Sequence, residues 1–483
     1  MNFLQKAAIK LLGLKRSYEG GKRGRRTKHW LNSNAAPDTE IGRSLTALRS
    51  RSRDLVRNNT WAKAGVDVLT DEVIGTGIVG VIKGRNKTQT KRLNTLWKKW
   101  SGSRSIDYDG RQNFAGLQRL AARSTFEAGE VFIRARRKTF KPGSGEFPLE
   151  IQLIEADHLE ITDTKNLKDG AFIIHGIEFN KDGKRVGYHV LKNHPGNNQI
   201  TAVKEKHFIS TDDMSHLYRI DRPGQNRGVP ILAPAIIKLR DLDEFEDAQI
   251  VRQKIAACYA VFVIQNEVPD LMGLTESEKE EIGEKVEPGL IQFLGPGEDI
   301  KFADPPGIND YKEFISVNLH SVSKSIGVTY EAMSGDLSEI NFSSARMGKL
   351  QMDRGVKSWQ KNVIKPLFLD FVGQEFLRTA FLMGEDVSGA GFIWTNPKTE
   401  MIDPTKEVPA KVKEIRAGLT TLPEAIKERG GDPDQTLQEI EEFNKLLDEK
   451  GITLDSDPRQ LNQSGSKHNI VNEDEETKLE EEE

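Results

Sequence analysis

The sequence predicts an α+β protein of elongated shape, and three observations indicate this fold class. Residues 130–219 contain short alternating apolar runs that are typical of strands. Two long helical segments, at about 228–264 and 343–384, carry heavy charge and only modest apolar stripes. Between them, residues 261–307 combine β-prone pieces with glycine and proline. Long helices of this kind usually pack their stripes against neighbouring copies, so the pattern favours an assembly protein over an enzyme.

The composition excludes several classes of protein. Of the 483 residues, 36% are hydrophobic and 30% are charged, so the chain can bury a core and still expose a large hydrated surface. A single cysteine, Cys258, excludes an intramolecular disulfide framework and a cysteine-based zinc site. No apolar run approaches the ~20 residues that cross a bilayer, and we therefore expect no membrane partner.

The two ends of the chain carry opposite charge. Residues 1–30 hold nine Lys or Arg residues and one Glu, whereas residues 471–483 hold eight acidic residues and one Lys. We therefore predict a basic, mobile arm over 1–42 and a disordered acidic tail over 452–483. The sequence leaves open whether the arm contacts nucleic acid or only assists assembly and is trimmed.

The front half, residues 43–230, is predicted to mix helices and strands. Apolar residues at helical spacing predict helices over 43–75, 87–100 and 111–128. Strands are expected at 130–136, 149–154, 177–179, 186–190, 207–210 and 215–219. The segment Asn180-Lys181-Asp182-Gly183 between two of these strands predicts a hairpin turn.

The first long helix bears a dense acidic cluster, formed by Asp241, Asp243, Glu244, Glu246 and Asp247. A divalent-metal site needs carboxylates that converge in a cavity, but these residues wrap around a helix. The cluster therefore favours a solvated or channel-facing surface. After the helix, Val261–Ile264, 290–293 and 300–302 are β-prone pieces of a small module, and a shorter helix is expected at 309–326.

A polar loop over 328–341 is predicted to lead into the second long helix. Ser343 or Ser344 is placed to cap this helix, whose forty or so residues would span ~60 Å. Pro366 is expected to kink or break it, because proline lacks an N–H and clashes with the preceding turn.

The C-terminal part has strong helix signals. Thr421-Leu422-Pro423-Glu424 has the form of a capping box, and Gly430 is placed to end the helix that follows. Asp432 then supplies a second cap, with Pro433 at the first helical position and a helix running to about Lys450.

Motifs for enzymatic chemistry are missing from the sequence. No phosphate-binding loop exists, since Gly348-Lys349 lacks the upstream glycine and the following hydroxyl. His189 and His194 are five residues apart, which is poor spacing for metal ligands, and no nucleophile elbow is found. We therefore expect no enzyme activity, no metal and no cofactor.

Several motifs in order resemble the lambda-type family of tailed-bacteriophage portal proteins, over roughly residues 43–440. They are Arg53–Asn59, Gly75-Thr76-Gly77, Tyr218–Pro230, Leu239–Glu244, Lys254–Cys258, Glu287-Pro288-Gly289, Asp299–Phe302, Asn341–Arg346, Ile402–Glu407 and Ala417–Thr421. Each motif is weak alone, but their number and order make the resemblance fairly specific.

The resemblance implies a ring, usually of twelve subunits, at one capsid vertex of the virion, assembled in the host bacterial cytoplasm. It implies that a separate terminase large subunit pumps double-stranded DNA through the ring. It also implies major capsid and scaffold proteins and head-completion or tail adaptor proteins as partners. Transferred by position, the family's parts are the wing over 43–230 and 346–399, stem helices over 231–262 and 309–327, the clip over 263–308, the tunnel loop over 328–345 and the crown over 400–451.

A channel for DNA constrains the charge of its lining. Because many Lys or Arg contacts would hold duplex DNA tightly, acidic and small polar groups suit a lining along which DNA must slide. The loop residues that meet this requirement are Glu331, Asp336, Glu339, Asn341 and Ser343. Arg346 and Lys349 are candidates for weak phosphate contacts, and Asp241, Asp243, Glu244 and Asp247 are candidates for an acidic stem face. The alternative, that the loop residues are merely solvated, stays open.

Two other classes of protein compete with this interpretation. A different head-tail adaptor would also form a ring, but adaptors are typically much shorter and lack paired long helices around a β module. A packaging-associated nucleic-acid enzyme would need a nucleotide motif or converging carboxylates, and the sequence shows neither.

Overall fold

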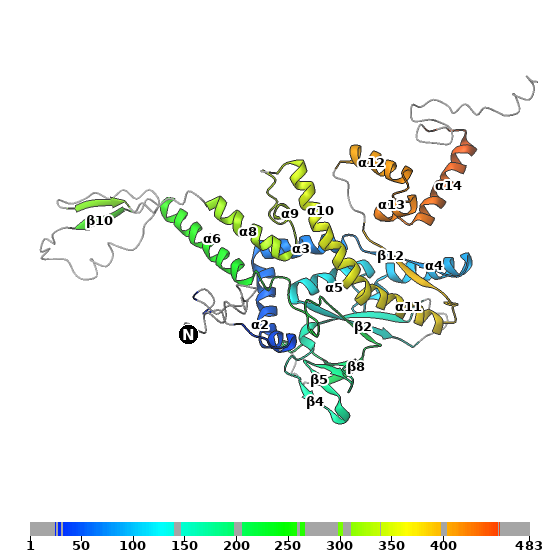
Figure 1. Cartoon of the computed structure of the whole chain (residues 1–483), viewed down its shortest axis with the longest axis horizontal. Helices are drawn as coiled ribbons and strands as arrows, with labels where there is room; N and C mark the ends of the chain where they lie inside the picture. Colours follow the sequence, from blue (N-terminus) through cyan, green and yellow to red (C-terminus); the bar gives the residue numbers. More distant parts are fainter. Residues whose placement is uncertain are drawn as a thin grey trace, which may run out of the picture.

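The computed structural model describes residues 25, 28–29, 32–139, 146–197, 205–257, 261–265, 298–302, 311–338, 340–397, 403–452 and 454. It is a mixed helix and sheet protein, as expected. Figure 1 shows a central body of helices and sheets, a pair of helices that projects from one side, and a small helical group above the body. Most of the predicted basic arm and nearly all of the predicted acidic tail lie outside the described residues.

Four helices form one part of the body: α2 (Pro37–Asn58), α3 (Thr60–Ile74), α4 (Lys87–Gly102) and α5 (Phe114–Ala128). The single helix expected over 43–75 is wrong, because the chain bends at Asn59. Asn59 adopts an extended conformation, and its side chain accepts a hydrogen bond from the Ala62 N–H at 2.9 Å. An asparagine that caps the next helix in this way favours a new start over continuation.

Two antiparallel sheets pack beside these helices. In the first, β2 (Glu130–Arg137) lies between β3 (Leu149–Glu155) and β9 (Met214–Tyr218). The second has the order β4 (Lys165–Asn166), β5 (Phe172–Ile174), β6 (Ile177–Phe179), β7 (Arg185–Leu191) and β8 (Lys206–Ser210). The hairpin between β6 and β7 is confirmed: the Asn180 N–H donates to Lys184 O, and Gly183 has a φ of 76°.

A third, two-stranded sheet joins distant parts of the chain. In it β1 (Val79–Lys83) pairs antiparallel with β12 (Gly391–Thr395). Trp97 and Trp100 pack beneath this sheet as buried core residues, in contact with Phe376 and the rings of β12.

The projecting pair consists of α6 (Ile236–Ala257) and α8 (Tyr311–Ile326), which run side by side (Figure 1). The helix expected from about 228 begins only at Ile236, because residues 231–235 form turns that bury Leu232 and Ala235 in the core. Beyond the pair, β10 (Val261–Gln265) pairs antiparallel with β11 (Glu298–Phe302), which confirms two of the predicted β pieces. The piece at 290–293 lies outside the described residues.

The second long helix is confirmed, but with changes at its start and in its middle. The expected polar loop contains a short helix, α9 (Tyr330–Ser334), and the cap of α10 (Phe342–Trp359) is Asn341 rather than Ser343 or Ser344. Pro366 does not break the helix. The chain winds as a π-helix over Gln360–Leu369, labelled η5, and then continues as α11 (Asp370–Leu382). This wider winding accommodates a ring that clashes in an α-helix.

Three helices form the group above the body: α12 (Pro404–Arg416), α13 (Leu422–Glu428) and α14 (Pro433–Lys450). Both predicted caps are confirmed. Thr421 forms a capping box with Glu424, and the Asp432 side chain accepts a hydrogen bond at the start of α14. Among the described helices, none is long and apolar enough to cross a membrane.

Candidate functional site

The predicted loop lies where the chain turns from α8 into α10, with α9 in between. α9 packs on α3 and α8 through the buried side chain of Met333, and the Tyr330 ring stacks on His320 at 4.1 Å between ring centroids. Thr329 caps the start of α9, and Gly335 ends it in the left-handed conformation with a φ of 71°. The base of the loop is therefore held on the body by α9.

The candidate channel residues differ in how the loop holds them. Asp336 accepts hydrogen bonds from the Ser338 hydroxyl at 2.6 Å and the Ser338 N–H at 3.0 Å, and these bonds lower the pKa of Asp336. Asn341 uses its side chain to accept from the Ser344 N–H, so its side-chain oxygen is engaged. Glu331 is half-buried and Ser343 is exposed. Glu339 lies outside the described residues.

Exposed apolar side chains share the loop with these polar groups, and sequence reasoning overlooked them. Leu337 is 65% exposed, Met347 is 68% exposed, and Phe342 is also exposed. The sequence signal that could have revealed them is the presence of large apolar residues next to the polar residues that cap α10. The loop is therefore not a purely polar surface, and it carries apolar groups that a neighbouring molecule can cover.

The two candidate phosphate-contacting residues are not equivalent. Lys349 forms ion pairs with Glu72 of α3 and, at 3.3 Å, with Asp353. Arg346 is exposed and forms no ion pair with another described residue. The charge of Lys349 is thus already balanced by Glu72 and Asp353, whereas Arg346 has no such partner in the part of the chain that the structure describes.

Two acids of the predicted cluster on α6 contact the neighbouring helices. Asp243 accepts a hydrogen bond from the Asn59 side chain at 3.2 Å, and Glu246 accepts one from Trp61 Nε1 at 3.2 Å, so both contact the region where α2 ends and α3 begins. Glu244 pairs with Arg240 one turn away. Asp241 and Asp247 remain exposed. Asp243 and Glu244 are exposed as well, so the acidic stem face at positions 241, 243, 244 and 247 stays a prediction.

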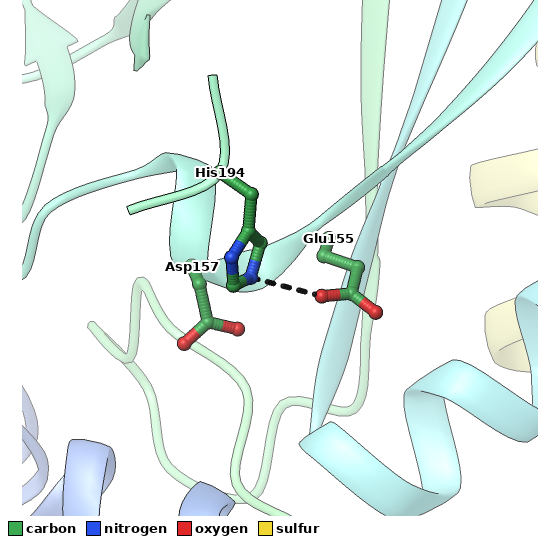
Figure 2. A group of neighbouring side chains, drawn as sticks. All are labelled: Glu155, Asp157 and His194. Atoms are coloured by element: carbon green, nitrogen blue, oxygen red, sulfur yellow. Dashed lines mark ion pairs between the residues drawn. The ribbon is translucent and has the colours of Figure 1, made fainter. Parts of the chain in front are cut away.

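Among the described residues, Glu155, Asp157 and His194 bring ligand-type atoms within 4.8 Å of one another (Figure 2). The hydrogen bonding of His194 opposes a metal here. Its Nδ1 accepts from the Gly196 N–H at 3.0 Å, so in the neutral ring the proton sits on Nε2, which lies 3.1 Å from Glu155 Oε2. A metal-binding histidine instead donates from the nitrogen that does not bind the metal.

Two arginines also balance the carboxylates of this group. Arg53 Nη2 lies 2.6 Å from Asp157 Oδ2 and 3.5 Å from Glu155 Oε2, and Arg49 Nη1 lies 3.4 Å from Asp157 Oδ1. Burial would raise the pKa of Asp157, but Arg49 and Arg53 lower it. The group therefore serves as an ion-pair network that fastens the segment after β7 to the end of β3.

A buried charge network lies at the centre of the body. Glu130 of β2 receives Arg49 Nη2 at 2.8 Å, Arg227 Nη2 at 2.6 Å, His216 Nε2 at 2.9 Å and the Gly228 N–H at 2.8 Å. Burial alone would raise the pKa of Glu130, but Arg227, His216 and Arg49 outweigh it and hold that pKa well below its usual range. Every polar atom of this carboxylate is thus matched, which indicates a structural role.

Comparisons with known proteins agree with the sequence motifs. The family model described as "Phage portal protein, lambda family" matches residues 23–360. The probable portal protein of Halomonas phage phiHAP-1 is 25% identical over 462 residues, which cover 91% of this chain and 88% of that protein. Portal protein B of Escherichia phage lambda is 22% identical over 466 residues, which cover 86% of this chain and 87% of that protein.

Solved structures give a weaker likeness. The neck of a native GTA particle, computed with C12 symmetry, contains a chain that is 14% identical to this one, with a TM-score of 0.45. The alignment covers 81% of this chain and 94% of that chain. A score of this size supports no argument about assembly.

Proposed function

Because this chain belongs to the lambda family of phage portal proteins, we propose that it assembles into a closed ring around a channel for double-stranded DNA at one capsid vertex. The family match over residues 23–360 is the observation that carries this proposal. In the virion such a ring connects head and tail. The chain itself acts as a conduit and docking platform and not as an enzyme, and the terminase supplies the motor.

The projecting helix pair supports assembly by contacts between copies. Lys238 Nζ lies 2.9 Å from Ser321 Oγ, and Phe245 packs against Phe314 with ring centroids 4.7 Å apart, so the pair forms one unit. On its outer surface Ile237 is 71% exposed and Val317 is 68% exposed. Exposed apolar residues on a charged rod suit a neighbouring copy in a head-to-tail ring. Twelve copies is the number expected from the family.

The parts of the subunit follow from their place in this arrangement. We assign 43–230 and 346–399 to the wing, 231–262 and 309–327 to the stem, 263–308 to the clip, 328–345 to the tunnel loop and 400–451 to the crown. The shape in Figure 1 fits this division, since the α6 and α8 pair projects from the body and the three C-terminal helices sit apart from it.

In this ring the tunnel loop faces the DNA. Asp336 is ionised at neutral pH like any ordinary aspartate, and its bonds from Ser338 lower its pKa further. Its charge repels phosphate at short range. Repulsion of this kind prevents the tight, salt-dependent contacts that would stall a sliding duplex. Arg346 then supplies a weak phosphate contact that has no base preference. Terminase, capsid and scaffold proteins and head-completion proteins are the expected partners of the outer surfaces.

A packaging assay with purified motor and empty capsids tests the channel assignment. Glu331→Lys combined with Asp336→Lys should slow or stall DNA packaging, because it replaces two repulsive groups with phosphate-binding ones in every subunit. Asp182→Lys, at the exposed hairpin between β6 and β7, is the matched control and should package normally. Equal packaging by the loop variant and the control would contradict the assignment.

A further inference from the structure

A row of unpaired positive charge runs along the long helix. Its members are Arg354, Lys357, Lys361 and Lys365, which we call the basic stripe; all four are exposed. None of them forms an ion pair with another described residue. The exposed positions between 354 and 366 otherwise hold only Gly355, Ser358, Asn362 and Pro366, so this surface has four cations and no carboxylate.

The charge balance of the stripe is unlike that of the helix just before it. Lys349, one turn and a half earlier, is balanced by Glu72 and Asp353. On α11, Arg378 lies 3.7 Å from Glu375. The chain as a whole has 70 basic and 73 acidic side chains. A solvated helix face in such a chain usually mixes both signs, so four cations in a row point to an anionic partner.

The stripe is preformed on a rigid support. Opposite the four cations, Val356, Val363, Ile364 and Phe368 are buried in the main core. Lys357, Lys361 and Lys365 all remain exposed across the start of the π-helical winding at Gln360, whereas Gln360, Val363 and Ile364 are buried. Binding therefore needs only the lysine side chains to become ordered, which keeps the cost of association low.

Neutral donors lie beside the stripe. Ser358 and Asn362 line a hollow of about 560 Å³ that also contains Arg219 and Trp359. Serine and asparagine side chains commonly donate to phosphate oxygens next to arginine and lysine. The stripe thus has the composition of a phosphate-backbone contact, and it offers no pattern that would distinguish bases.

We propose that the basic stripe binds the phosphate backbone of duplex DNA without sequence preference, as a second DNA contact in addition to the tunnel loop. This inference rests on the proposed portal function. The stripe extends over roughly 15 Å at the helical rise per residue, and that length of duplex carries about nine phosphate charges. The stripe and the loop have different roles. The positive charge of the stripe holds DNA beside the subunit, and the negative charge of the loop lets the DNA slide.

Salt-dependent binding of the full-length protein to a fluorescent duplex of mixed sequence tests the proposal. Each phosphate contact adds about 0.9 to the slope of log affinity against log salt. Lys357→Gln, Lys361→Gln and Lys365→Gln combined should weaken binding at low salt and reduce that slope by about 2 to 3. The matched control replaces three exposed lysines of α4, with Lys87→Gln, Lys91→Gln and Lys98→Gln, and should leave the slope nearly unchanged.

Four outcomes overturn the proposal. An unchanged slope in the stripe variant excludes a DNA contact, and equal losses in the stripe variant and the control indicate only general electrostatics. If electron microscopy shows that only the stripe variant fails to form rings, the stripe is a contact between protein subunits. If the stripe variant loses binding to polyglutamate but still binds DNA, the stripe binds an acidic protein instead. Failure of the wild-type chain to form rings would contradict the portal function separately, because the duplex titration does not depend on a ring.

Discussion

Arg227 Nη2 lies 2.6 Å from Glu130 Oε1, and neither side chain is exposed to solvent. The contact joins the segment after β9 to the start of β2, and Arg49 brings α2 to the same carboxylate. Arg227-Gly228 belongs to one of the motifs that carry the family resemblance. In this chain that motif contributes to stability, since it completes a buried ion-pair network rather than a surface for a ligand.

Glu130→Gln should lower the free energy of unfolding by about 3 to 5 kcal/mol, because it leaves two buried guanidinium groups without their counter-charge. Chemical denaturation measures this effect. Glu385→Gln breaks a pair with Arg92, whose side chain is 61% exposed, and should cost less than about 1 kcal/mol. A loss for Glu130→Gln as small as that of Glu385→Gln would contradict the structural role of the network.

Stability should fall as the pH drops from 6.5 toward 4, and His216 is a main cause. Burial lowers the pKa of His216 to about 4, despite its contact with Glu130. The unfolded chain therefore takes up this proton at a higher pH than the folded chain does. The stability that the neutral His216 contributes to the folded state is fully present above about pH 6.5. It is lost as the pH falls toward 4, by about 3 kcal/mol in all.

His216→Gln isolates this effect, because the amide retains one donor and one acceptor but does not titrate. Unfolding free energies measured between pH 7 and pH 4 should change less in the variant than in the wild type. The depressed pKa of Glu130 causes a further loss of stability that begins below about pH 5, so the contribution of His216 is read between pH 7 and pH 5. Parallel pH profiles for both proteins would show that His216 is not the titrating group.

Two glycines should respond to alanine in opposite directions. Gly129 has a φ of 94°, and a Cβ there would lie 2.6 Å from the Val229 carbonyl carbon. Gly129→Ala should therefore destabilise the fold by more than about 2 kcal/mol. Gly355 in α10 has an ordinary helical conformation and open space around it, so Gly355→Ala should add about 0.5 to 1 kcal/mol. Thermal unfolding of both variants measures these changes. If Gly129→Ala is as stable as the wild type, the close approach of the backbone at Gly129 to that at Val229 is wrong.

Zinc should leave the protein's stability unchanged, even though Glu155, Asp157 and His194 lie close together. His194 accepts at Nδ1, so its Nε2 carries the proton in the neutral ring, and Arg53 pairs with Asp157. Thermal unfolding with added Zn²⁺, and after treatment with a chelator, measures this. A stabilisation by zinc that disappears in His194→Ala would show that the three residues do bind a metal.

Local signals in the sequence predicted much of the fold. The hairpin at Asn180–Gly183 and the caps at Thr421 and Asp432 depend on neighbouring residues alone, and all three are confirmed. These features need no knowledge of distant parts of the chain.

Features that depend on distant residues escaped prediction. The pairing of Val79 with Thr395 joins segments from opposite ends of the chain. The partners of Glu130 come from α2, β9 and the segment after β9, so no spacing in the sequence links them. At the loop, Asn341 rather than a serine caps α10, since Ser344 serves as the third residue of the capping box. The role of the loop residues in lining a channel stays a prediction.

Electron microscopy of the purified full-length protein tests the central claim most directly. We predict class averages of annular particles with a central hole wide enough for duplex DNA, because exposed apolar residues on α6 and α8 need a neighbouring copy to cover them. Compact monomers at every protein concentration and salt concentration, with no annular particles even when capsid components are supplied, would contradict it.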